Sequence, residues 1–181
     1  MEKQEELQLI AEAKKGRHDV IRYLVERYEK EIFYYIYKMT GNTADAKDLT
    51  QEVFIKVFRK ISGFNGKSTF RTWLYRIATN QTLNFLNRRP PSGAEKPLEW
   101  FSDPSPTSLD RVEKADLHRF ILNAIGNLPR QQKAIVTLRV QEGMTYSEIA
   151  EILGRSVGNC KAAYHNAIVK LRGMFKNEAI L

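Results

Sequence analysis

The chain has 181 residues, 43% of them hydrophobic, and a formal net charge of +8. This allows one medium domain or two small ones with a packed core, and it argues against wholesale disorder. No apolar run reaches the roughly 18 residues of a membrane span, and the acidic N-terminus has no signal-peptide core, so we expect a cytoplasmic protein. The lone cysteine excludes an internal disulfide, and because the three histidines are scattered we expect no metal and no cofactor.

The first predicted helices lie between residues 20 and 61. Apolar residues recur every three to four positions and define one buried face: Val20, Leu24, Tyr28, Ile32, Ile36 and Met39. Gly41 and Asn42 supply a stop, after which Thr43 can cap a second helix. The apolar positions of this second helix are Ala46, Leu49, Val53, Val57 and Ile61.

The outward face of the second helix is acidic. It includes Asp45, Asp48, Gln51, Glu52 and Ile55. An acidic face cannot favour phosphate, so it fits a protein partner better than DNA. A face that is simply solvated is an equally good interpretation of the periodicity.

A loop, SGFNGKS, separates this helix from a third one over about residues 69–89. Four polar side chains of the third helix are spaced by four and therefore stack along one face, and Trp73 lies at the start of this face. They are Arg76, Asn80, Asn84 and Arg88. Ahead of them lie Phe64, Asn65, Lys67 and Phe70. Aromatic rings stack on unpaired bases, amides bond base edges and arginines hold phosphates, which favours single-stranded or melted DNA. The alternative places the aromatic rings in the core beside a solvated polar face.

A proline-rich stretch follows the third helix. Five of the six prolines fall within RRPPSGAEKPLEWFSDPSPTS, so no helix crosses it and we expect an interdomain linker. Residues 1–90 have a net charge of +6, residues 91–116 of −3, and residues 117–181 of +5. Two basic blocks around an acidic strip favour polyanionic partners. Within the strip, Trp100 and Phe101 either fold back on a domain or dock on a partner.

The C-terminal block contains the capping signals of two short helices. Thr145 and Glu148 fit a capping box, Gly154 fits a left-handed helix end, and Ser156 fits the next cap. LPRQQKAIVTLR, residues 128–139, supplies a supporting helix. On the last helix one face is apolar, with Val157, Cys160, Tyr164, Ala167, Ile168, Leu171 and Phe175, while the other is polar. This is the helix-turn-helix arrangement, whose second helix fits the major groove of DNA; an ordinary helical hairpin is the alternative.

Together these stretches resemble the extracytoplasmic-function sigma factors, the small two-domain initiation subunits of bacterial RNA polymerase. The resemblance rests on DAKDLTQEVF at 45–54, FRTWLYRIATN at 70–80, LPRQ at 128–131, and YSEIAEILG followed by VG at 146–154 and 157–158. It implies an all-α fold of two small helical domains, a helical bundle and a helix-turn-helix domain, joined by a proline-rich linker. The boundaries that we expect are 1–90, 91–112 and 113–181.

The resemblance also implies roles. Core RNA polymerase would bind Asp45, Asp48, Leu49, Gln51, Glu52 and Ile55. The melted −10 element would bind Phe64, Asn65, Lys67, Ser68, Phe70, Arg71, Trp73, Arg76, Asn80, Asn84 and Arg88. The duplex −35 element would bind Arg155, Ser156, Asn159, Lys161, Ala162, His165 and Asn166. The linker would thread into the polymerase cleft, and an anti-sigma factor would hold many such proteins inactive.

The recognition helix departs from the family pattern. Ala163, Asn166 and Ile168 stand where arginines are usual, which predicts weaker and less salt-sensitive −35 binding. Two other classes of protein fit the sequence less well. A stand-alone helix-turn-helix regulator would leave the stripe on the 69–89 helix unexplained. An enzyme is not expected, because the sequence offers no phosphate-binding glycine loop, metal cluster or nucleophile with a paired base.

Overall fold

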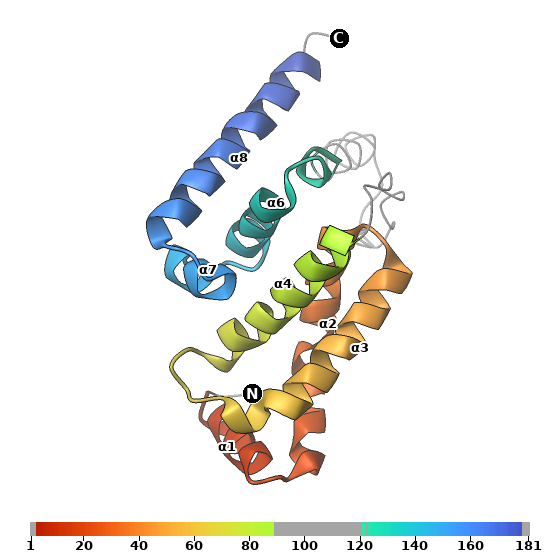
Figure 1. The fold of residues 1–181 in the computed structure, drawn as a ribbon, viewed down its shortest axis with the longest axis vertical. Helices are drawn as coiled ribbons and strands as arrows, with labels where there is room; N and C mark the ends of the chain where they lie inside the picture. Colours follow the sequence, from red (N-terminus) through yellow and green to blue (C-terminus); the bar gives the residue numbers. More distant parts are fainter. Residues whose placement is uncertain (1–2, 89–120, 122, 179–181) are drawn as a thin grey trace, which may run out of the picture.

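The computed structural model describes residues 3–88, 121 and 123–178 and is helical wherever it has regular structure (Figure 1). The predicted linker, 91–112, with Trp100 and Phe101, lies outside these residues. The elements are α1 (Lys3–Lys14), η1 (His18–Val20), α2 (Ile21–Thr40), α3 (Thr43–Lys60), η2 (Ile61–Gly63), α4 (Phe70–Arg88), α6 (Arg130–Val136), η3 (Thr137–Gln141), α7 (Tyr146–Leu153) and α8 (Val157–Glu178).

Helices α2, α3 and α4 form the N-terminal bundle, as the periodicity predicts. The predicted faces of α2 and α3 are buried; Ile32 and Val53, for example, are fully shielded from solvent. Gly41 ends α2 with a φ of 73°, a conformation that favours glycine. One detail was wrong: Asn42, and not Thr43, caps α3, because its side-chain oxygen accepts a 2.9 Å hydrogen bond from the Asp45 N–H.

Helix α1 was not predicted. It packs on the bundle through Ile10 and Ala13, which are 4% and 3% exposed. Much of the rest of its surface is solvent-exposed and polar or charged, so its sequence carries little of the apolar periodicity that marked α2 and α3. The Tyr28 hydroxyl of α2 donates a hydrogen bond to the carboxylate of Glu6, which fixes α1 against the bundle.

In the C-terminal part, residues 123–126 are helical, and α6 begins after Pro129. The predicted helix over 128–139 starts at Arg130 as α6 and widens at Thr137 into a π-helix, η3, which ends at Gln141. Because a π-helix carries an extra residue in its turn, it shifts the side chains that follow it. Glu142, directly after η3, is thereby directed toward the N-terminal bundle.

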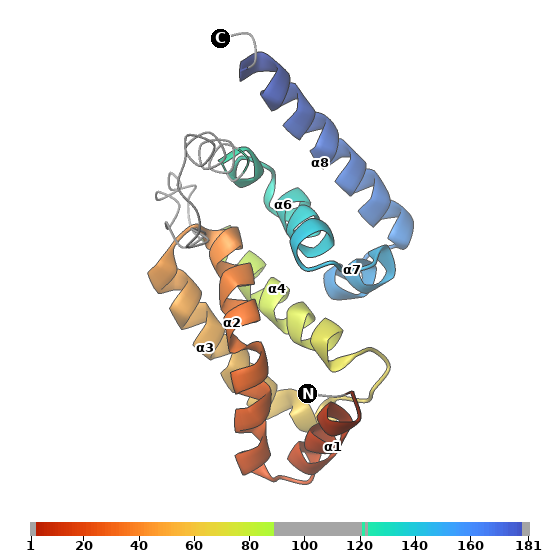
Figure 2. The same cartoon turned by 180° about the vertical axis from the view of Figure 1, so that it is seen from behind.

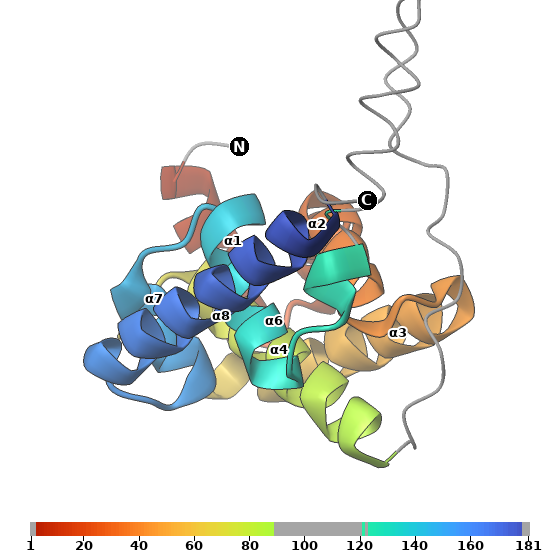
Figure 3. The same cartoon turned by 90° about the horizontal axis from the view of Figure 1, so that it is seen from above.

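Helix α4 lies between the other bundle helices and α6–α8, as the two opposite views show (Figures 1 and 2). The view from above shows α8 crossing over α6 on the side away from α3 (Figure 3). One continuous apolar cluster joins the two halves: it contains Tyr35 and Leu74 of the bundle and Leu138, Met144 and Ile149 of the C-terminal helices. The two halves are therefore packed directly against each other.

Candidate nucleic-acid interface

The turn between α7 and α8 has the predicted geometry. The Thr145 hydroxyl accepts a 3.2 Å hydrogen bond from the Glu148 N–H, and the Thr145 N–H donates one of 2.8 Å to the Glu148 carboxylate, which completes the capping box. Gly154 ends α7 with a φ of 62°. The Ser156 hydroxyl accepts from the Asn159 N–H at 3.1 Å, so it caps α8 as predicted.

The beginning of α8 presents the predicted reading face to solvent. All seven predicted side chains are exposed: Arg155, Ser156, Asn159, Lys161, Ala162, His165 and Asn166. On the opposite face Cys160 and Ala167 are fully buried. The prediction that Val157 belongs to the buried face was wrong, because it is 38% exposed at the first residue of the helix.

Tyr146 is a residue that the sequence did not single out. The guanidinium of Arg139 lies 4.9 Å from its ring centroid, and the Lys161 ammonium lies 5.9 Å from the same centroid. Tyr164 packs edge-on against the ring at 5.8 Å. A cation beside an aromatic face is attracted to it, so Tyr146 restrains Lys161 at the edge of the reading face. A tyrosine at the first position of α7 carries no signal of this role in the sequence.

The departures from the arginine pattern differ in exposure. Ala163 and Ile168 are half-buried and pack against the apolar clusters, whereas Asn166 is exposed. An arginine at position 163 or 168 would have to leave this packing to reach DNA. Asn166 is therefore the departure that bears most directly on DNA contacts.

The predicted stripe on α4 is open to solvent. Arg76, Asn80, Asn84 and Arg88 are all exposed, and their spacing of four aligns them along one side of the helix. The side of α4 that contains Leu74 and Ala78 is fully buried. The stripe can thus meet a long polyanion without any change in the bundle core.

The loop before α4 is divided between core and surface. Asn65 and Lys67 are exposed and Ser68 is half-buried; the Asn65 side chain accepts a 3.1 Å hydrogen bond from the Lys67 N–H. Phe64 and Phe70, by contrast, are 5% and 2% exposed. Their rings lie 5.3 and 5.7 Å from the half-buried ring of Trp73. The core alternative therefore holds for the two phenylalanines, which offer no free face for a base.

Arg71 lies at the boundary between the two halves, half-buried rather than free. Its Nε lies 3.5 Å from a carboxylate oxygen of Glu31, and its Nη2 lies 3.5 Å from one of Glu142. Burial lowers the pKa of Arg71, but the neighbouring Tyr75, Glu31 and Glu142 outweigh it and the net direction is upward. Burial, followed by the charge of Glu142, raises the pKa of Tyr75, so its hydroxyl stays protonated and donates to Glu142 at 2.5 Å.

The outward face of α3 combines an acidic edge with an apolar groove. Asp48, Gln51, Glu52 and Ile55 are exposed and Asp45 is half-buried, whereas Leu49 is 3% exposed and belongs to the core. The periodicity predicted Leu49 on the buried face, where it lies; the direct polymerase contact that the resemblance implies for it does not fit this burial. A groove of about 1080 Å³ runs between α2 and α3. Gln51, Ile55, Phe58, Phe33, Lys30, Lys47 and Arg59 are among its lining residues.

Two family models match the chain: Sigma-70 region 2 over residues 24–90 and Sigma-70 region 4 over residues 119–171. The ECF RNA polymerase sigma-E factor of Haemophilus influenzae is 33% identical over 180 residues, which span 94% of this chain and 93% of that protein. The chain belongs to the extracytoplasmic-function sigma factors. It is therefore a sigma factor: it binds core RNA polymerase, directs it to promoters and promotes DNA melting for transcription initiation.

Solved structures agree with this fold. CnrH in complex with the cytosolic domain of CnrY has a TM-score of 0.69 at 22% identity, covering 93% of this sigma factor and 96% of that chain. The sigma factor RpoE of Bartonella quintana, in complex with the anti-sigma factor NepR, has a TM-score of 0.67 at 18% identity, covering 86% and 96%. Among the described helices of this sigma factor, none has the length and apolarity to cross a membrane.

Two further points follow from the family. The match to region 2 covers α4 and its stripe, which a stand-alone helix-turn-helix regulator would not need, so that alternative is not favoured. The all-α fold class that the sequence predicts is confirmed.

Proposed function

We propose that this sigma factor makes its specific contacts through three surfaces. They are the stripe on α4 for the melted −10 element, the first turns of α8 for the −35 element, and the outward face of α3 for core polymerase. The exposed α4 stripe carries the proposal most directly, because its two asparagines between two arginines combine base-edge and phosphate chemistry on one solvent-exposed line.

In the −10 surface, Arg76 and Arg88 hold phosphates while Asn80 and Asn84 meet base edges. The 64–71 loop contributes Asn65, Lys67 and Ser68. Phe64 and Phe70 contribute indirectly, since they support the ring of Trp73 from the core side. Trp73 is half-buried, which leaves part of the ring for stacking against an extruded base.

In the −35 surface, the exposed start of α8 enters the major groove. Lys161, His165 and Asn166 carry the readout, and Asn166 favours adenine because an amide pairs with its N6 and N7. Arg155 and Ser156 lie at the N-terminal end of the helix, where the helix dipole and free N–H groups favour a phosphate.

The polymerase surface is tested by charge reversal. The D48K/E52K variant should lose co-purification with core polymerase, because Asp48 and Glu52 form the exposed acidic edge of α3. The matched control E26K/E151K reverses two exposed carboxylates on α2 and α7. Unchanged affinity of D48K/E52K for core in a binding titration, with both variants folded by circular dichroism, would reject this assignment of α3.

The groove beside this face suits a protein partner with an amphipathic helix. Ile55 and Phe58 are 51% and 44% exposed, and Lys30, Lys47 and Arg59 also line the groove. An anti-sigma factor that covers α3 would exclude core polymerase, and the complex of a fold relative with NepR is consistent with such a partner. We place this sigma factor in the cytoplasm, where core polymerase acts, with no catalytic activity of its own.

A further inference from the structure

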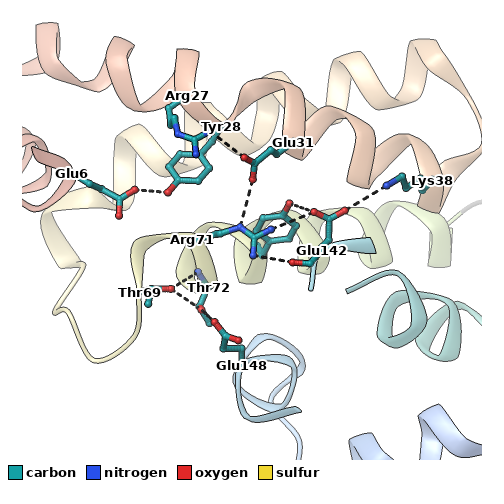
Figure 4. A network of polar contacts seen from close by, with 11 residues as sticks. Glu6, Arg27, Tyr28, Glu31, Lys38, Thr69, Arg71, Thr72, Glu142 and Glu148 are labelled. Carbon is teal, nitrogen blue, oxygen red and sulfur yellow. Dashed lines mark hydrogen bonds and ion pairs between the residues drawn. The ribbon is translucent and has the colours of Figure 1, made fainter. Parts of the chain in front are cut away.

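Glu142 joins region 4 to region 2 through a buried carboxylate. Its side chain is 9% exposed. Tyr75 donates a 2.5 Å hydrogen bond to it from α4, and the Lys38 ammonium of α2 lies 3.6 Å from its other oxygen (Figure 4). The Arg71 guanidinium completes the set: Nη2 lies 3.5 Å from the carboxylate, and Nη1 donates a 3.1 Å hydrogen bond to the Glu142 backbone carbonyl.

Other contacts join the two regions along α4. The Thr72 hydroxyl lies 3.4 Å from the Glu148 carboxylate, so the capping box of α7 also contacts region 2. Farther along, Arg130 donates a 2.9 Å hydrogen bond to Asn87. The apolar cluster shared by the two regions lies beneath these contacts. Region 4 therefore packs along α4 while the stripe side chains stay exposed.

This closed arrangement cannot read both promoter elements at once. Their names place them about 25 base pairs apart, which is roughly 85 Å along straight B-DNA at 3.4 Å per base pair. Helix α4 is about 28 Å long and α7 about 12 Å, and packed helices lie about 10 Å apart. Any point of the α4 stripe is therefore within roughly 50 Å of the start of α8. Promoter engagement requires region 4 to separate from α4.

We propose that Glu142 is the latch of a closed resting state in which the protein's own region 4 occupies the Arg71 end of the −10 surface. Its carboxylate takes the place that a phosphate would take on Arg71, so region 4 and the −10 strand compete for the same guanidinium. Opening of the latch frees Arg71 and also lets the two regions separate to the promoter spacing. The Arg71 part rests on the proposed −10 function and on the −10 role that the resemblance implies for Arg71; the latch itself does not.

The latch can be tested by comparing two variants that each replace a glutamate with glutamine. E142Q keeps the shape of the side chain but removes the charge that Arg71 and Lys38 face. E151Q makes the same exchange at an exposed position of α7. Each full-length variant would carry dyes on cysteines introduced at the exposed Lys60 and Lys170, with Cys160 replaced by alanine. Single-molecule energy transfer then reports the closed and open populations of the free protein.

We expect the wild type and E151Q to be mainly closed and E142Q to raise the open fraction on the order of tenfold, since it weakens hydrogen bonds to a charged group. Y75F, which removes one donor, should shift the population in the same direction by less. An open fraction in E142Q equal to that of E151Q would overturn the latch, as would a wild type that is already open. Equal helicity and melting behaviour of the variants excludes unfolding as the cause.

A second readout separates the two parts of the proposal. Single-stranded DNA with the −10 sequence of a promoter selected with the holoenzyme should bind free E142Q several-fold more tightly than E151Q. If E142Q opens without this gain, the competition for Arg71 is refuted while the latch stands. If it neither opens nor gains affinity, the whole inference fails.

Discussion

Replacement of Asn166 by arginine should steepen the salt dependence of promoter binding. Asn166 is exposed on the reading face of α8, whereas Ala163 and Ile168, the other positions where related proteins carry arginine, are half-buried. One added phosphate contact changes the slope of log affinity against log salt by about 0.9. Between 50 and 200 mM salt, N166R should therefore lose about 3.5-fold more affinity than the wild type.

The assay is fluorescence anisotropy of holoenzyme on a labelled promoter, titrated at several salt concentrations. N127R makes the same exchange at another exposed position of region 4 outside the predicted reading face, and it should leave the slope unchanged. Equal slopes for N166R and wild type would show that position 166 does not approach a phosphate. Equal steepening in N127R would assign the effect to overall charge and refute the reasoning from the α8 face.

Three further outcomes follow from the structure. Burial lowers the pKa of Lys133 from 10.5 to about 8, so the free energy of unfolding of the wild type should rise between pH 8 and 10.5. In urea titrations at pH 7, K133M should be more stable than the wild type by about 1–3 kcal/mol, and this difference should disappear by pH 10.5. Equal stability of the two proteins at pH 7 would contradict this prediction. T145A should lose about 1 kcal/mol of stability. Burial raises the pKa of Glu148, but hydrogen bonds from Thr145 lower it overall, so the stability lost in T145A should become smaller below pH 4.5. A loss of stability that does not change with pH would exclude the charged capping box. Replacing the exposed loop residues 65–68 with a glycine-serine segment, which keeps the buried Phe64 and Phe70, should abolish permanganate reactivity of promoter thymines while core binding persists, whereas wild-type reactivity would reduce the loop to a connector.

Local signals predicted the helix ends well. Gly154, Ser156 and the Thr145–Glu148 box behave as the sequence indicates, because capping depends on residues only three or four positions apart. The α4 stripe was predictable for the same reason: a spacing of four places side chains on one face whatever the tertiary context.

Contacts between distant segments were not predictable in this way. Arg71 was assigned to DNA alone because nothing in the sequence around it indicates Glu142, which lies 71 residues away beyond the proline-rich stretch. Phe64 and Phe70 suit base stacking and core packing equally, and only the position of Trp73 and the bundle decides between the two. Leu49 had two assignments, a buried position from its spacing and a polymerase contact from the resemblance, and its burial supports the first.

The most direct test of the central assignment is run-off transcription with purified core polymerase on a randomised promoter library. We predict that the chain alone gives no transcripts, that core with the chain gives specific run-off products, and that the selected promoters share two elements separated by a spacer. Substitution of Arg76 and Asn80 together by alanine should abolish these products without loss of core binding. Products that are the same with and without the chain, or selected promoters that share only one element, would contradict the account.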